Sequence, residues 1–133
     1  MKDYNQPLSG NDMPHFGGIA SLFRLPVQSD SSGLDVALVG VPLDIGTSNR
    51  TGSRYGPREI RSESVLVRPY GMATRAAPFD SFQVADTGDV ALNAYSLEKS
   101  IPLIEQHFDK LLAGGAKTVV MGGDHTITLP ILR

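Results

Sequence analysis

The sequence predicts an α/β fold built around a parallel sheet. Three apolar runs of strand length alternate with segments of helical periodicity, in the order β-α-β-α-β-α. The first run is apolar on both faces, which is typical of a central strand in a parallel sheet. Because strand–helix–strand units cross over with a right-handed turn, we expect all three strands to run the same way in one sheet.

An N-terminal arm is expected over residues 1–33. This stretch is rich in Pro, Gly, Ser and Asn and has only scattered large apolar residues, such as Phe16 and Ile19. A polar turn at 28–33 separates it from the first strand. We expect the arm to drape over the α/β body formed by residues 34–133, or over a neighbouring subunit.

The first strand is predicted at 35–41, where the apolar run is closed by Pro42. A long polar loop, Gly46–Gly56, follows. Pro57 fits the first turn of a helix, because its missing N–H would have no partner there. The apolar or small residues that follow at helical spacing are Ile60, Ser64 and Val67.

The second strand is predicted at 82–86, and the helix after it is the clearest in the chain. The apolar stripe of this helix consists of Leu97, Ile101, Ile104, Phe108, Leu111 and Leu112. Ser96 or Ser100 can cap it. Pro102 costs about 3 kcal/mol deep inside a helix but is tolerated near its start, so we favour a start near Ser100 or a kinked first turn. The pair of glycines at 114–115 ends the helix.

The third strand is predicted at 117–121, and Thr126 or Thr128 is expected to cap a last helix with Pro130 in its first turn. A helix this short is marginal alone, and a three-stranded parallel sheet leaves edges and faces uncovered. We therefore expect the chain to be the N-terminal part of a larger protein.

Composition narrows the class of protein. A chain of 133 residues with 41% hydrophobic and 20% charged residues is typical of one globular domain. The net charge of −2 does not favour nucleic acid or anionic membrane as a partner. The sequence has no cysteine, and it has neither a secretion signal nor an apolar run of the roughly 18 residues that a membrane span needs. The expected compartment is the cytoplasm.

The strongest functional signal is the run from Val119 to Thr126. An apolar strand ends in two glycines, and Asp124 and His125 follow. Ligands of open α/β sheets bind at the carboxyl ends of the strands, and a neutral imidazole is a good metal ligand. Asp124 can bind the metal directly or orient a ligand. The alternative is an ordinary turn with a surface histidine. Since a catalytic zinc site typically needs three protein ligands, further ligands must come from elsewhere.

Other polar residues carry weaker signals. The Gly46–Gly56 loop contains Arg50 and Arg54, but it lacks the glycine spacing of nucleotide-binding loops, so it either cradles a phosphate or shapes the rim of a cleft. Asp86 and Asp89 suit a common strand-end turn. The two remaining histidines, which we interpret chiefly as surface or structural residues, are His15 and His107.

Three segments together resemble the ureohydrolase superfamily, which comprises arginase, agmatinase and related guanidino-acid hydrolases. The segments are Gly-Val-Pro-Leu-Asp at 40–44, Arg-Tyr-Gly-Pro-Arg-Glu-Ile-Arg at 54–61 and Gly-Gly-Asp-His-Thr at 122–126. The resemblance runs from about Asp35 to Arg133. Pro-His-Phe-Gly-Gly at 14–18 and the segments at 68–70 and 77–80 are most similar to the agmatinase and guanidinobutyrase branch.

The resemblance implies an arginase-like three-layer α/β/α fold, of which this chain is the N-terminal part. It also implies two Mn²⁺ ions at the strand ends, with His125 as a ligand of one ion and Asp124 beside it as a supporting acid. The expected residues of the cleft rim are Arg50, Arg54 and His15. The family's other ligands lie in an Asp-Ala-His-x-Asp run and an Asp-x-Asp run, and neither run occurs in this sequence. Homo-oligomers, either trimers or hexamers, are implied as well.

The implied reaction is the hydrolysis of a small cationic guanidino substrate to urea and an amine. Paired metals make hydroxide near neutral pH, and hydroxide attacks the guanidinium carbon. The sequence leaves two substrates open: agmatine, which gives putrescine, and 4-guanidinobutyrate, which gives 4-aminobutyrate. We expect the 133 residues alone to be inactive. One alternative is a truncated, non-catalytic paralogue that acts as an assembly or regulatory partner. A weaker one is a phosphate-binding module that uses the Gly46–Gly56 loop.

Overall fold

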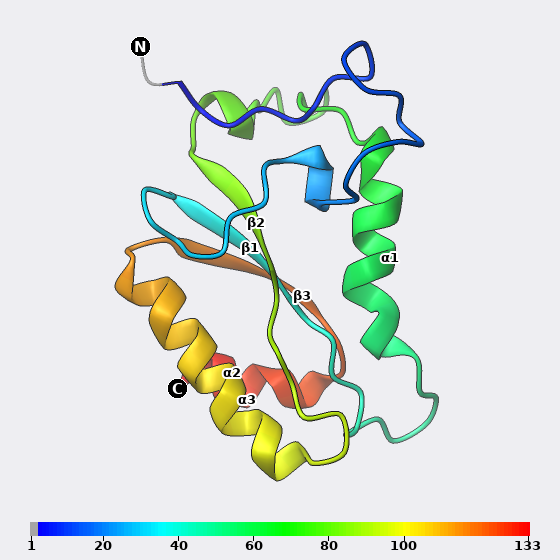
Figure 1. Ribbon diagram of the computed structural model, residues 1–133, viewed down its shortest axis with the longest axis vertical. Helices are drawn as coiled ribbons and strands as arrows, with labels where there is room; N and C mark the ends of the chain where they lie inside the picture. Colours follow the sequence, from blue (N-terminus) through cyan, green and yellow to red (C-terminus); the bar gives the residue numbers. More distant parts are fainter. Residues whose placement is uncertain (1–2) are drawn as a thin grey trace.

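A parallel three-stranded sheet forms the centre of the computed structural model, which describes residues 3–133 (Figure 1). The strands are β1 (Val36–Val41), β2 (Val84–Asp89) and β3 (Lys117–Gly122), in the order β2-β1-β3. Both neighbours pair with β1 in parallel. The predicted parallel α/β sheet is confirmed, and the apolar run at 35–41 is its central strand.

Helices cover both faces of the sheet. Helix α2 (Leu97–Ala113) and the short α3 (Thr128–Leu132) lie on one face, whereas α1 (Gly56–Glu63) lies on the other (Figure 1). Successive side chains of a strand point to opposite faces. Val39 and Val41 therefore enter the core beneath α2, and Leu38 packs with buried residues of the N-terminal segment. This double burial explains why the run is apolar on both faces, and it produces the expected three layers.

The N-terminal segment contributes to the core through its second half. Leu22 and Leu25 are buried against Leu38, and a parallel bridge joins Val27 to Asp86. A single 3-10 turn, η1 (Leu22–Arg24), lies between these contacts. Residues 22–27 thus pack on the sheet, while Phe16 and Ile19 remain exposed. None of the helices among residues 3–133 is long and apolar enough to cross a membrane.

Helix α2 begins earlier than its proline suggests. Ser96 caps it by accepting a hydrogen bond from the Lys99 amide, so the expected start near Ser100 is wrong. Ser100 is instead a fully buried helix residue whose hydroxyl donates to the Asn93 carbonyl at 2.8 Å. Pro102 lies inside the helix on an exposed face, where it deprives only the Glu98 carbonyl of an intrahelical partner.

Two other local predictions need correction. The inward face of α1 and the 3-10 turn after it, η3 (Ser64–Leu66), carries Pro57, Arg61 and Ser64, whereas Ile60 is exposed. Arg61 can be buried because it forms ion pairs with carboxylates of β2, as described below. The last helical segment starts with a 3-10 turn, η5 (His125–Ile127), that Asp124 caps, rather than Thr126 or Thr128.

Candidate metal and substrate site

The carboxyl ends of the three strands meet at one end of the molecule. The turn after β3 packs against the segment that leaves β1, with the Asp124 amide donating to the Leu43 carbonyl at 2.7 Å. Gly123 has a φ of +79°, and a Cβ there would lie 2.5 Å from the Val41 carbonyl oxygen. Only glycine satisfies both conditions. The two glycines that end the apolar run therefore let the turn close over β1.

His125 is exposed at the start of η5, directly beyond the end of β3. Its Nδ1 lies 3.3 Å from the Thr128 hydroxyl, with the donor set by the tautomer. The ring has no other hydrogen-bond partner within residues 3–133. Its Nε2 is therefore free to bind a ligand, which is the arrangement that a metal-binding imidazole needs.

Asp124 supports the turn, and its hydrogen bonds go to groups other than the imidazole. One of its carboxylate oxygens accepts from the amide and the hydroxyl of Thr126. The other accepts from the Gly46 amide at 2.8 Å. Asp124 thus caps η5 and ties the turn that carries His125 to the loop after β1.

A second carboxylate organises the Gly46–Gly56 loop from within. The Asp44 side chain is fully buried and accepts from the Arg54 Nε at 2.6 Å and from the Gly52 amide at 2.8 Å. The hydrogen bond from Arg54 is the main reason why the pKa of Asp44 falls to about 2. Gly46, Gly52 and Arg54 therefore bind carboxylates of the chain itself, which counts against a phosphate cradle in this loop.

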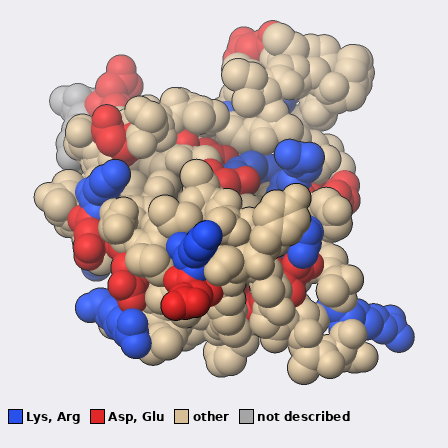
Figure 2. All heavy atoms as spheres, turned by 60° about the horizontal axis from the view of Figure 1, so that its bottom comes forward, with Lys and Arg blue, Asp and Glu red and all other residues tan. Residues whose placement is uncertain are grey.

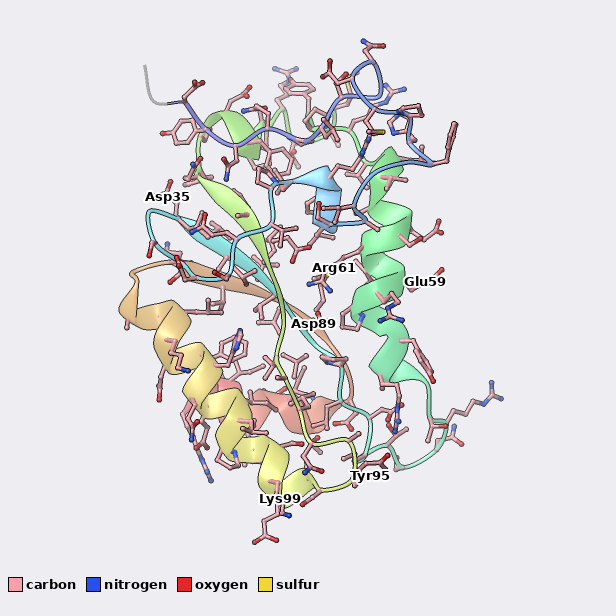
Figure 3. The ribbon with its side chains drawn as sticks, in the orientation of Figure 1. Asp35, Glu59, Arg61, Asp89, Tyr95 and Lys99 are labelled. Atoms are coloured by element: carbon pink, nitrogen blue, oxygen red, sulfur yellow. The ribbon has the colours of Figure 1, made fainter. Side chains whose placement is uncertain are left out.

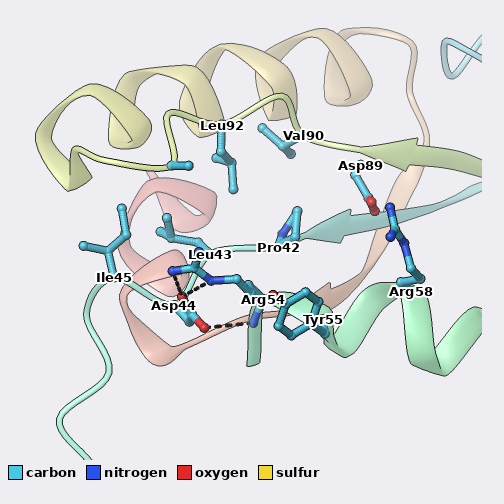
Figure 4. Close-up of a pocket in the computed structure, with 11 residues that line it drawn as sticks. Pro42, Leu43, Asp44, Ile45, Arg54, Tyr55, Arg58, Asp89, Val90 and Leu92 are labelled. Atoms are coloured by element: carbon cyan, nitrogen blue, oxygen red, sulfur yellow. Dashed lines mark hydrogen bonds and ion pairs between the residues drawn. The ribbon is translucent and has the colours of Figure 1, made fainter. Parts of the chain in front are cut away.

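A pocket of about 310 Å³ opens between the ends of β1 and β2 (Figure 4). It has polar and apolar walls and lies beside the Asp44–Arg54 pair. Its lining consists of Pro42, Leu43, Asp44, Ile45, Arg54, Tyr55, Arg58, Asp89, Val90, Leu92 and Ala94. When the lower end of the molecule in Figure 1 is turned forward, the visible face bears interspersed acidic and basic side chains (Figure 2).

Arg61 forms a buried ion network that the sequence analysis missed (Figure 3). Its Nε donates to Asp86 at 2.7 Å, and another guanidinium nitrogen donates to Asp89 at 2.6 Å. Burial acts to raise the pKa of Asp86, but hydrogen bonds from Arg61 and from the Leu22 and Gly88 amides outweigh it and lower the pKa. The sequence pattern that could have predicted this network is an arginine one helical turn after Pro57 together with two aspartates at the end of the next strand.

The structure brings together only some of the residues singled out in the sequence. Arg54 and Arg50 both lie in the Gly46–Gly56 loop, which Asp124 holds through Gly46; Arg54 lines the pocket, whereas Arg50 is exposed. His15 lies elsewhere: its Nδ1 is 3.5 Å from an Arg24 nitrogen, and it faces residues 65–69 beyond the far end of α1. His107 is half-buried in α2, and burial lowers its pKa.

No group of three or more His, Cys, Asp or Glu side chains that could hold a metal forms within residues 3–133. His125 nevertheless fits one position of a manganese site, because imidazole and carboxylate ligands suit Mn²⁺ and its Nε2 is free. The rest of the ligand set would have to come from outside the described residues.

Comparison with known proteins decides the family. Residues 34–133 match the sequence profile of the arginase family. The chain belongs to the arginase family. This range contains the sheet, the Gly46–Gly56 loop and His125, so the whole carboxyl-end site described above lies within the matched part.

Curated relatives include proteins named guanidinobutyrase and agmatinase. The chain is 62% identical over 135 residues to a guanidinobutyrase from Pseudomonas aeruginosa, covering 99% of this chain and 42% of that protein. It is 52% identical to a mitochondrial agmatinase from Gallus gallus, covering 98% of this chain and 38% of that protein. The chain thus spans about two-fifths of the length of the curated relatives that it matches.

Solved structures bear out the arginase-like fold. The proclavaminate amidino hydrolase from Streptomyces clavuligerus superposes with a TM-score of 0.85 at 36% identity, covering 90% of this chain and 40% of that one. A hypothetical agmatinase from Burkholderia thailandensis gives a TM-score of 0.82 at 36% identity, with 89% and 38% covered. The three-layer arrangement is therefore that of part of an arginase-like domain.

Proposed function

We propose that the protein to which this chain belongs is a manganese-dependent guanidino hydrolase that releases urea. The observation that carries the proposal is a single imidazole with a free Nε2, held at the carboxyl end of β3 in a chain of the arginase family. Relatives named guanidinobutyrase and agmatinase support the reaction class. The remaining metal ligands are proposed to come from outside residues 3–133.

The chemistry that such a site must supply follows from the substrate. The guanidinium carbon is a poor electrophile because resonance spreads its charge. A bound pair of divalent ions supplies an activated water near neutral pH. Within this chain, His125 would hold one ion through its Nε2, and Asp124 keeps the turn beneath it in place through Thr126 and Gly46. The pocket beside Asp44 and Arg54 would receive the rest of the substrate.

The first substrate to test is 4-guanidinobutyrate, because the relative at 62% identity is named guanidinobutyrase. The full-length protein should be loaded with Mn²⁺ and assayed for urea release from 4-guanidinobutyrate and agmatine. Urea release that disappears on chelation and returns with Mn²⁺ is the expected result. Failure to release urea from any guanidino compound, with metal bound, would overturn the proposed activity.

Self-association is part of the same proposal. Phe16 is 97% exposed and Ile19 is 78% exposed on the N-terminal segment, and large exposed apolar side chains often mark subunit contacts. We expect the full-length protein to form a homo-oligomer that uses this segment. Light scattering of the wild type and of Phe16→Ser checks this, and a wild-type monomer would contradict it. A non-catalytic assembly partner would instead associate with a full-length relative without releasing urea.

A further inference from the structure

One charged residue of the pocket beside β1 and β2 has no counter-ion. Asp44 and Arg54 pair with each other at 2.6 Å, and Asp89 accepts from Arg61 at 2.6 Å. Arg58 also lines the pocket, but it makes no hydrogen bond or ion pair with any described residue. Its side chain is exposed. The pocket thus presents one guanidinium group whose donors are all available to a ligand.

The remaining lining suits a short methylene chain. Pro42, Leu43 and Val90 form apolar wall between the charged residues, and the volume of about 310 Å³ is in the range of small-molecule sites. Arg58 lies at the end of the pocket where Asp89 lies, and Ile45 lies at the other end (Figure 4). The pocket therefore has one end with the unpaired guanidinium of Arg58 and another end formed by Ile45, in the loop after β1.

The second end adjoins the part of the chain that is hydrogen-bonded to the turn carrying His125. Gly46, which follows Ile45, donates to Asp124, the residue before His125. In the order β2-β1-β3, the ends of β2 and β3 are two strand spacings apart, about 10 Å. A small molecule whose guanidinium group lies near His125 would direct its other end along this path to the long, unpaired side chain of Arg58.

We propose that Arg58 binds the carboxylate of an ω-guanidino acid and thereby selects guanidino acids over guanidino amines. The inference rests on the proposed hydrolase function and names its substrate class. An arginine fork matches a carboxylate with two parallel hydrogen bonds. The terminal ammonium of agmatine would instead meet a like charge, which disfavours it. Arg58 is thus assigned as a specificity residue, acting on the part of the substrate that does not react.

The test uses the full-length, manganese-loaded protein and its Arg58→Gln variant. Urea release is measured with 4-guanidinobutyrate, agmatine and butylguanidine, whose tails are anionic, cationic and neutral. We expect KM for 4-guanidinobutyrate to rise roughly tenfold or more, as for the loss of a charge-assisted hydrogen bond. The value for butylguanidine should stay unchanged, and that for agmatine should fall or stay unchanged. Since the carboxylate is remote from the reacting carbon, kcat should change less than KM.

Two controls separate this role from a structural one. Arg68→Gln removes an exposed arginine beyond the other end of α1 and should leave all three KM values unchanged. Arg58→Lys keeps the charge and should restore part of the affinity for 4-guanidinobutyrate. If Arg58 only supports the shape of the pocket, Arg58→Gln will shift KM for all three compounds alike, and the assignment is wrong. A wild type that prefers agmatine overturns the assignment and leaves the hydrolase function standing, whereas one inactive on all three compounds overturns the function itself.

Discussion

At the scale of single residues, Asp124 and His125 are neighbours with different tasks. The histidine has a ring nitrogen without a hydrogen-bond partner among residues 3–133. Both carboxylate oxygens of the aspartate accept hydrogen bonds, from two backbone amides and one hydroxyl group. From the sequence, Asp124 was expected either to bind a metal itself or to orient a ligand. Here the support acts through the turn, because Asp124 caps η5 and fixes the loop after β1.

Replacing His125 with Ala in the full-length protein should lower manganese content and cut turnover strongly. The side chain is exposed and its one hydrogen-bond contact is with the Thr128 hydroxyl, so the free energy of unfolding of the metal-free protein should change by less than about 0.5 kcal/mol. Metal analysis, urea release and urea denaturation measure the three quantities. His107→Gln in α2 serves as the histidine control. Unchanged metal content in His125→Ala would remove this residue from the site.

Replacing Asp124 with Ala should destabilise the protein as well as weaken the site. Loss of the cap alone costs about 0.5–2 kcal/mol, and the Gly46 amide loses its partner too. We expect a lower midpoint of urea denaturation and weaker Mn²⁺ binding by calorimetry. Asp109→Ala, an exposed aspartate in α2, is the matched control. A variant that binds Mn²⁺ more weakly with no loss of stability would instead indicate direct contact between Asp124 and the metal.

At the scale of elements, α1 is held to the sheet by an ion network as well as by apolar packing. Arg61 reaches Asp86 and Asp89 at the end of β2, and Asp86 also accepts from the Leu22 amide of the N-terminal segment. Three pieces of the chain that are distant in sequence are thus joined at one buried carboxylate. Both charged partners are nearly inaccessible, with side-chain exposures of 10% for Arg61 and 2% for Asp86.

Arg61→Ala should therefore destabilise the full-length protein by about 3–5 kcal/mol, because it leaves a buried carboxylate without its counter-ion. Arg61→Lys should fall between this variant and the wild type, since an ammonium cannot reach both aspartates with a fork. Urea denaturation of the two variants and of the Arg68→Ala control measures the effect. A loss below about 1 kcal/mol in Arg61→Ala would mean that water reaches and stabilises Asp86 once the arginine is removed.

The Gly46–Gly56 loop should respond to acid. The pKa of Asp44 is about 2 in the folded protein, against 3.8 without these contacts. Because the folded value is lowered, the stabilising contribution of Asp44 is complete above about pH 4 and is lost as pH falls toward 2. We expect the melting temperature of the wild type to fall across this window more steeply than that of Asp44→Asn. Parallel curves for the two proteins would show that Asp44 does not drive the acid response.

At the scale of the whole molecule, the sequence was sufficient for a parallel sheet and for a histidine just beyond the end of its third strand. Continuous apolar runs such as 35–41, together with one amphipathic helix, predict a parallel sheet, and the place of the candidate site follows because strand ends gather at one edge. Long-range polar contacts could not be predicted in this way. On α1 the apolar Ile60 is exposed and Arg61 is buried by partners 25 and 28 residues away, which helical periodicity does not reveal.

Gly40, in the central strand, constrains a side chain of the pocket because it lies directly against Asp89. It lies on the central strand where the register between β1 and β2 shifts, and a Cβ there would collide with the Asp89 carboxylate and crowd Pro57. In a library of random substitutions scored for both abundance and turnover, position 40 should therefore behave like a binding-site position, with activity falling further than protein level. A survey that counted only residues in reach of substrate would pass over it. Any redesign of the pocket that shifts Asp89 or the first turn of α1 must therefore keep the space that Gly40 leaves for them.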